Sequence, residues 1–280
     1  MYPFHEVTQI NEHLYVIREL NLVNMYLILG EKYAMLLDTG YGYIDFRPLI
    51  RELTGLPLIV VNTHSDIDHA GGNHLFEEVW LSQWDYAGLA ATDDTEKMKK
   101  PQLAYRAGKN PGMLEAMDQE VYFATSVYQA GYRFCDSGHI FDLGGRRLEV
   151  MNIPGHTPGS IALFDCSTGI LFTGDSIVYK HNVYYMMSYC QPLKVFQHTL
   201  GELWKRRASI TALYPAHGIW GVSPELILET WENIEDIPLR YQKDEKLVTA
   251  NGWVGYKHYY KDTLIVYSEV RLQELLEHGL

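Results

Sequence analysis

The sequence predicts an α/β fold, and three observations point to it. Short runs rich in β-branched and aromatic residues open the chain as strand candidates, at residues 13–18, 24–30 and 33–38. After Pro57, the continuous apolar run LIVVNT is typical of a strand that is buried on both faces. Residues 45–54 and 192–207 have the apolar spacing of helices.

The order of these elements predicts where polar residues gather. Turns with Gly, Asn or charged residues separate the three opening runs, which indicates a meander. Polar residues then crowd the exit of the buried strand at Thr63, where α/β sheets place their chemistry. Residues 83–138 interrupt the β pattern with short helical segments, and we interpret them as an inserted helical lid. Strand-like runs return from residue 139, and the tail after residue 240 predicts a strand pair and a last helix.

The length and composition fit one globular domain. The chain has 280 residues, of which 47% are apolar and 21% are charged, so it can bury a sizeable core. Its sequence contains no linker-like segment, low-complexity stretch or fixed-period repeat. We therefore predict a single domain over residues 1–280.

The charge and the absence of targeting signals limit which partners and which cellular location the sequence predicts. The formal net charge is -12, which repels a phosphate backbone and argues against nucleic acid as a partner. No apolar stretch approaches 18 residues, and the first residues lack the basic-then-apolar pattern of a secretory signal. The three cysteines form no CxxC motif. We expect a cytoplasmic protein with reduced cysteines and no membrane partner.

Residues of metal-ligand type follow the predicted strands. Four of them fall within six positions of one loop: His64, Asp66, Asp68 and His69. Three more each lie just beyond a strand-like run, beside Gly or Pro: His156, Asp175 and His217. Imidazole and carboxylate ligands suit Zn, Fe or Mn, and one carboxylate can bridge two ions.

A lone histidine at a strand end is usually an ordinary structural residue, so the grouping carries the argument. Asp66, Asp68 and Asp175 would repel one another at close range unless cations neutralised them. The seven residues together therefore predict a centre with two divalent cations.

Five motifs in a fixed order identify a family. They are NMYLILGEKYAMLLDTGYG, THSDIDHAGG, PGHTPGSIALF, LFTGDSI and YPAHG. In this order, over residues 10–240, the chain resembles the metallo-β-lactamase fold superfamily, which includes glyoxalase II and lactonases. The resemblance implies a four-layer αββα sandwich, here with a helical insert.

The resemblance also implies how the ligands divide between the two ions. Site 1 would take His64, Asp66 and His156, site 2 would take Asp68, His69 and His217, and Asp175 would bridge them. Asp38 would orient the ligand loop without binding metal.

Asp66 departs from the family's usual first motif, His-x-His-x-Asp-His, because it replaces the second imidazole. A carboxylate at this position makes the site less positive, by about one unit of charge. Such a site favours Fe or Mn more than an all-imidazole site does. We expect two divalent ions, either Zn or, given Asp66, Fe or Mn.

The leading hypothesis is a dinuclear metal-dependent hydrolase with a small-molecule substrate. A metal-bridging hydroxide would attack an ester, thioester, lactone or phosphoester. Asp68 would be catalytic, since it can carry a proton from the nucleophile to the leaving group. Tyr179, Tyr184 and Tyr185 would line the substrate pocket, where a hydroxyl can stabilise an oxyanion.

Two other functions stay open. Flavodiiron proteins carry a Glu where this chain has Asp66, so a di-iron O₂ or NO reductase with a separate electron donor is one alternative. Against it, the chain has no flavodoxin-like segment and no phosphate-binding Gly loop for FMN. A metal-binding sensor without turnover is the other. The Tyr-rich insert and tail offer a contact for a homodimer.

Overall fold

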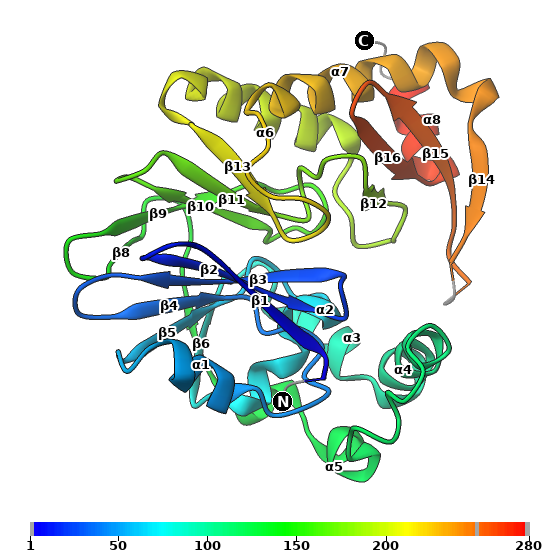
Figure 1. The fold of residues 1–280 in the computed structure, drawn as a ribbon. Helices are drawn as coiled ribbons and strands as arrows, with labels where there is room; N and C mark the ends of the chain where they lie inside the picture. The colour runs from blue at the N-terminus through cyan, green and yellow to red at the C-terminus, as the bar shows by residue number, and fades with distance from the viewer. Residues whose placement is uncertain (1–2, 250–251, 278–280) are drawn as a thin grey trace. The chain divides into compact units, whose positions relative to one another are not determined.

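The computed structural model describes residues 3–249 and 252–277 (Figure 1). The backbone clusters into two compact units, and the division falls between Leu148 and Glu149. The boundary falls inside a strand, β9 (Arg147–Asn152). The single domain expected over residues 1–280 stays a prediction.

A seven-stranded sheet, counted over the described residues, forms the centre of the first unit. Its strands lie in chain order: β1 (His5–Asn11), β2 (Leu14–Glu19), β3 (Val23–Leu29), β4 (Ala34–Leu37), β5 (Leu58–Val61), β6 (Glu78–Leu81) and β7 (Gly131–Phe134). Strands β1 to β4 pair antiparallel, which confirms the predicted meander. Strands β4 to β7 pair in parallel, so their carboxyl ends point the same way.

Two helices follow strands β4 and β5 of this sheet. Helix α1 (Arg47–Leu53) begins with a proline in its first turn and buries Leu49 and Ile50 against the sheet. It confirms the helix expected at residues 45–54. The short helix α2 (Ile67–Ala70) follows β5 and carries part of the polar cluster itself.

The insert predicted over residues 83–138 holds helices α3 (Leu89–Asp93), α4 (Lys100–Ala107) and α5 (Gln119–Ala124), and it ends with strand β7. Its apolar side chains belong to a buried cluster of the first unit: Leu103, Met113, Met117 and Tyr122 pack with Phe4, Val23, Tyr41, Tyr43 and Ile67. Part of the insert therefore belongs to the hydrophobic core of the first unit. Its role as a lid stays a prediction.

Strand β8 (Ile140–Asp142) and a turn lead into β9, where the second unit begins. In the second unit β9 neighbours β10 (Ile161–Asp165), which pairs antiparallel with β11 (Ile170–Gly174). β11 in turn pairs in parallel with β13 (Ala212–Pro215). The carboxyl ends of β11 and β13 therefore lie next to each other.

Helices α6 (Leu193–Lys205) and α7 (Glu225–Arg240) lie side by side over this sheet (Figure 1). Helix α6 confirms the helix expected at residues 192–207. The apolar faces of α6 and α7 share one core with β10 and β11. Among the described residues, no helix is long and apolar enough to span a membrane.

A second sheet of this unit, four-stranded over the described residues, has the order β12 (Asn182–Tyr185), β16 (Thr263–Tyr267), β15 (Val254–Tyr260) and β14 (Glu245–Val248). The strand pair predicted for the tail is β15 and β16, and the last helix is α8 (Glu269–Glu277). The sequence did not predict that β12, far earlier in the chain, would join them. It does so in parallel with β16.

Candidate metal centre

The ligand loop of the first unit, residues 64–69, follows strand β5 and runs into α2. Asp38, at the end of the neighbouring strand β4, is buried and fastens this loop at both ends. Its Oδ1 accepts a hydrogen bond from the Thr63 amide at 2.7 Å, and its Oδ2 lies 2.9 Å from Nδ1 of His69. One carboxylate thus fixes the loop that carries four candidate ligands.

Residues of the insert hold the middle of the same loop. The Ser65 amide donates to Oδ2 of Asp85 at 2.7 Å, and the hydroxyl of Thr92 donates to the Ser65 carbonyl. Asp85 and Thr92 both lie within residues 83–138, so the insert helps to position His64 and Asp66 on either side of Ser65. No sequence motif indicated this contact.

The hydrogen bonds define the tautomers of the two imidazoles in this loop. Oγ1 of Thr63 gives its proton to Asp38, so Nδ1 of His64, 3.0 Å from that oxygen, must be the donor between them. Nδ1 of His69 donates to Asp38 in the same way. The lone pair of each neutral ring is therefore on Nε2, an arrangement in which Nε2 can serve as a metal ligand.

Each Nε2 of the loop faces a carboxylate. Nε2 of His64 lies 3.8 Å from Oδ2 of Asp66, and Nε2 of His69 lies 3.7 Å from Oδ1 of Asp68. The two imidazole rings are only 4.0 Å apart between centroids. Both rings are buried, whereas the two aspartate side chains are partly exposed. The first unit thus presents four donor atoms from one loop.

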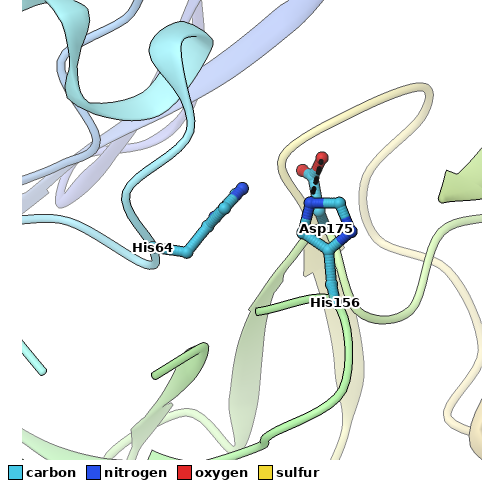
Figure 2. A group of neighbouring side chains, drawn as sticks. All are labelled: His64, His156 and Asp175. Carbon is cyan, nitrogen blue, oxygen red and sulfur yellow. Dashed lines mark ion pairs between the residues drawn. The ribbon is translucent and has the colours of Figure 1, made fainter. Parts of the chain in front are cut away.

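In the second unit, three loops bring three candidate ligands together. His156 follows β9, Asp175 follows β11 and His217 follows β13. Oδ2 of Asp175 lies 3.9 Å from Nε2 of His156 (Figure 2). The same oxygen lies 3.2 Å from Nε2 of His217. Because β11 and β13 are parallel neighbours, Asp175 and His217 leave the sheet at the same edge.

His156 has the same tautomer as the histidines of the first unit, for a different reason. Its Nδ1 lies 2.8 Å from the carbonyl oxygen of Tyr184, which only accepts hydrogen bonds. Nδ1 is therefore the donor, and the lone pair is on Nε2, which faces Asp175. Here a main-chain group does what the Asp38 side chain does in the first unit.

The donor set fits divalent cations. The four imidazole–carboxylate separations, two in each unit, run from 3.2 to 3.9 Å. Two ligand atoms that share a tetrahedral ion at about 2.1 Å lie about 3.4 Å apart, whereas a hydrogen bond would bring most of these pairs closer. The residues of each unit thus have the chemistry and spacing of metal ligands.

A buried acid lies behind the Asp38 turn. The pKa of the Glu19 carboxyl is raised to about 8, chiefly by burial. A hydrogen bond from the Tyr41 amide lowers this pKa in part, and the charge of Asp68 adds to the rise. Arg106, from α4 in the insert, donates from Nε to the Tyr41 hydroxyl at 3.0 Å. No sequence signal marks Glu19, because an acid at a strand end is usually exposed to solvent.

The three tyrosines expected in the substrate pocket have different environments. Tyr185 is fully buried, and its ring stacks on Phe196 at 5.0 Å between centroids. Tyr184 and Tyr179 are partly buried, and they pack against the core of the second unit. Their role in substrate binding stays a prediction.

Sequence reasoning missed His181. Its ring stacks on that of the candidate ligand His217, with centroids 5.3 Å apart and planes only 8° from parallel. In the sequence it is an isolated histidine between Lys180 and Asn182, with none of the Gly or Pro neighbours that marked the other candidates.

Comparisons with known proteins agree with the fold and the motif order. The family model described as "Metallo-beta-lactamase superfamily" matches residues 18–217. A metallo-beta-lactamase from Pontibacter korlensis has a similar structure, with a TM-score of 0.57 and 20% identity over 82% of this chain and 99% of that one. This likeness confirms the predicted fold class.

Two curated relatives are more similar in sequence. The chain is 30% identical over 178 residues to acyl-coenzyme A thioesterase MBLAC2 of Bos taurus, which is 56% of this chain and 59% of the relative. It is 28% identical over 150 residues to hydroxyacylglutathione hydrolase GloC of Haemophilus influenzae, 52% of this chain and 61% of the relative. The match thus spans about three-fifths of the length of these relatives. By the family model, the chain belongs to the metallo-beta-lactamase superfamily.

Proposed function

We propose that the protein is a dinuclear metal-dependent hydrolase whose substrates are thioesters. The observation that carries this proposal is the set of imidazole–carboxylate pairs at 3.2 to 3.9 Å, with three rings held in the tautomer that leaves Nε2 as a ligand. Membership of the family supports the further step that the two units contribute to one centre.

The ligands would divide between the ions as the motif order implies: His64, Asp66 and His156 at site 1, Asp68, His69 and His217 at site 2, and Asp175 between them. The four imidazole–carboxylate pairs measured within the units are compatible with this division, with Asp175 shared by both sites. Asp38 would hold the loop in place. With the carboxylate of Asp66 at site 1, Fe or Mn is a candidate beside Zn.

When bound, the cations would supply a hydroxide nucleophile at neutral pH and polarise the substrate carbonyl. Hydrolysis of a thioester forms one C–O bond, breaks the C–S bond and moves one proton from water to the departing thiolate. Asp68 is the proposed carrier of that proton, because its side chain is partly exposed whereas the imidazoles beside it are buried.

The names of the two curated relatives support thioesters over the other candidate esters. Acyl-coenzyme A and hydroxyacylglutathione are both thioesters of an anionic thiol carrier, although the carriers differ in size. The small-molecule substrate, the cytoplasmic location and the homodimer expected from the sequence belong to the same proposal.

The test is metal analysis followed by thiol release. Protein purified without added metal is analysed for its elements, then assayed with an acyl-coenzyme A, an S-acylglutathione and an oxygen ester. We expect two metal ions per chain and thiol release that a chelator abolishes and added metal restores. No metal after reconstitution with Zn, Mn or Fe would overturn the proposal. Metal without turnover would favour a sensor, and two iron ions with O₂ consumption would favour a reductase.

Single ligand variants sharpen this test. His69→Ala and His217→Ala should each lower the stoichiometry from two ions toward one, because a site with too few ligands no longer competes with water. His198→Ala, on the exposed face of α6, is the matched control and should keep both ions.

A further inference from the structure

We propose that residues 181–185, the ligand bracket, position both histidine ligands of the second unit, and that the C-terminal tail holds this bracket in place. The proposal rests on the proposed function, since it concerns the same metal centre. It gives a role to the tail, which lies beyond the residues 18–217 that match the family model.

The bracket touches His156 in two ways. The Tyr184 carbonyl accepts the Nδ1 proton of His156 at 2.8 Å, which fixes both the tautomer and the direction of the ring. The Tyr185 ring meets the same imidazole edge to face, with centroids 6.3 Å apart and planes at 86°. The Tyr185 ring stacks on Phe196, so it is held in place and limits the movement of the His156 ring.

The bracket touches His217 through His181. The two imidazoles stack nearly parallel, with centroids 5.3 Å apart, so His181 limits how far the His217 ring can tilt toward it. His217 follows Ala216, whose amide donates to the Gly174 carbonyl just before Asp175. One end of the bracket thus meets His156 and the other meets His217, while Oδ2 of Asp175 faces both.

The tail holds the bracket through the main chain. Strand β12, which forms the bracket from Asn182 onward, pairs in parallel with β16, with Val183 opposite Ile265 and Tyr185 opposite Tyr267. Just before β12, the Lys180 amide donates to the Asp262 carbonyl at 2.8 Å. All five residues of β16 are buried, so this strand is a firm support.

Buried polar contacts fix the tail in turn. His258 of β15 is buried between Asp236 of α7 and Asp244, with ring nitrogens 2.9 Å from both carboxylates. The Tyr267 hydroxyl of β16 donates to the same Asp244 at 2.6 Å. From α8, the buried Arg271 donates to the Cys190 carbonyl in the loop after β12. A substitution in the four-stranded sheet that the tail forms with β12 would therefore displace the bracket as well.

Contacts of this kind matter because an imidazole must point its lone pair at the ion. Removing groups that orient metal ligands typically lowers metal affinity by about 10- to 100-fold, although no ligand is lost. The expected phenotype of a damaged bracket is weaker metal binding by a protein that keeps all seven candidate ligands.

The experiment measures metal affinity by equilibrium dialysis of the full chain with Zn²⁺ or Mn²⁺ against a competing chelator. His181→Ala removes the stacked ring, and we expect about a 10-fold loss of affinity. His181→Phe keeps a flat ring in the same place and should restore most of it. His198→Ala should bind as the wild type does.

A tail variant tests the second half of the proposal. Ile265→Ala removes buried volume beside β12, and we expect weaker metal binding, again without loss of a ligand. In metal-free, ¹⁵N-histidine-labelled protein, NMR should find His156 as the Nδ1–H tautomer in the wild type and as a mixture of tautomers in Ile265→Ala.

Wild-type affinity in folded His181→Ala and Ile265→Ala, with an unchanged His156 tautomer, would overturn the bracket. If the wild type binds no metal at all, the proposed function fails instead, and the tautomer measurement alone then decides whether the tail positions His156. If Ile265→Ala does not fold, the comparison of His181→Ala with His181→Phe decides the role of the bracket.

Discussion

The two units orient their candidate ligands by different means. In the first unit, four candidates lie in six consecutive positions, and one buried side chain, Asp38, fixes the loop that carries them. In the second unit, three candidates come from three loops, and a main-chain carbonyl and a stacked ring orient the histidines. Asp38 lies within a motif and could be found in the sequence, whereas neither the Tyr184 carbonyl nor the isolated His181 left a signal there.

Asp175→Ala should lower metal content and turnover more than any variant that follows, because Asp175 faces both histidines of the second unit. We expect thioester hydrolysis to fall at least about 100-fold, since the proposed bridging carboxylate would hold ions that supply several kcal/mol of transition-state stabilisation. Metal content and turnover are measured together. Full metal and full activity in this variant, beside a loss in His156→Ala, would show that Asp175 does not bridge.

Asp38→Asn tests the first unit alone. Asn tolerates the left-handed backbone of position 38, where φ is +64°, so the variant should fold. The neutral Asn side chain would hold the Nδ1 proton of His69 less strongly than the Asp38 carboxylate does. Because this contact orients the His69 ring, we expect metal affinity to fall by about 10- to 100-fold. Dialysis against a chelator measures it. An affinity equal to that of the wild type would mean that the loop holds its shape without Asp38.

Asp66→His should change which metal binds more than how well the protein folds. Adding an imidazole in place of a carboxylate raises the charge of the site by about one unit, so preference should shift toward Zn and the pKa of bound water should fall. Competition at equal Zn and Mn concentrations, then pH–rate profiles with one metal, measure both effects. Unchanged preference and profile would indicate that Asp66 is not a ligand.

Glu19→Gln should have the smallest effect on the metal centre and a visible one on stability. The Glu19 pKa is raised to about 8, so between pH 4.5, the ordinary pKa of a Glu carboxyl, and pH 8 the folded state keeps a proton that the unfolded state releases. The free energy of unfolding should therefore fall as pH rises from 4.5 toward 8, and Gln should remove this slope. Urea denaturation across that range measures it. Parallel slopes in the two proteins would show that Glu19 is not the group responsible.

The sequence predicts most of the sheet and the candidate ligands, because apolar runs and clustered polar residues are local signals. Strand β1 escaped notice since its residues alternate between half-buried and exposed, which leaves no apolar run. Strand β12 could not be paired with β16 because about 80 residues separate them and parallel pairing has no local signature. His181 and the Tyr184 carbonyl gain their meaning only from the fold.

The left-handed backbone at Asp38 has a consequence for how this protein tolerates mutation. Most residues other than Gly, Asn and Asp are strained at such a position. Of these three residues, Asp alone supplies a charged acceptor for both Thr63 and His69. Most substitutions would therefore be unfavourable for two reasons: they strain the main chain at position 38, and they remove the acceptor that holds the ligand loop. In a saturation mutagenesis library selected for metal-dependent activity, position 38 should be nearly as intolerant as the candidate ligands themselves.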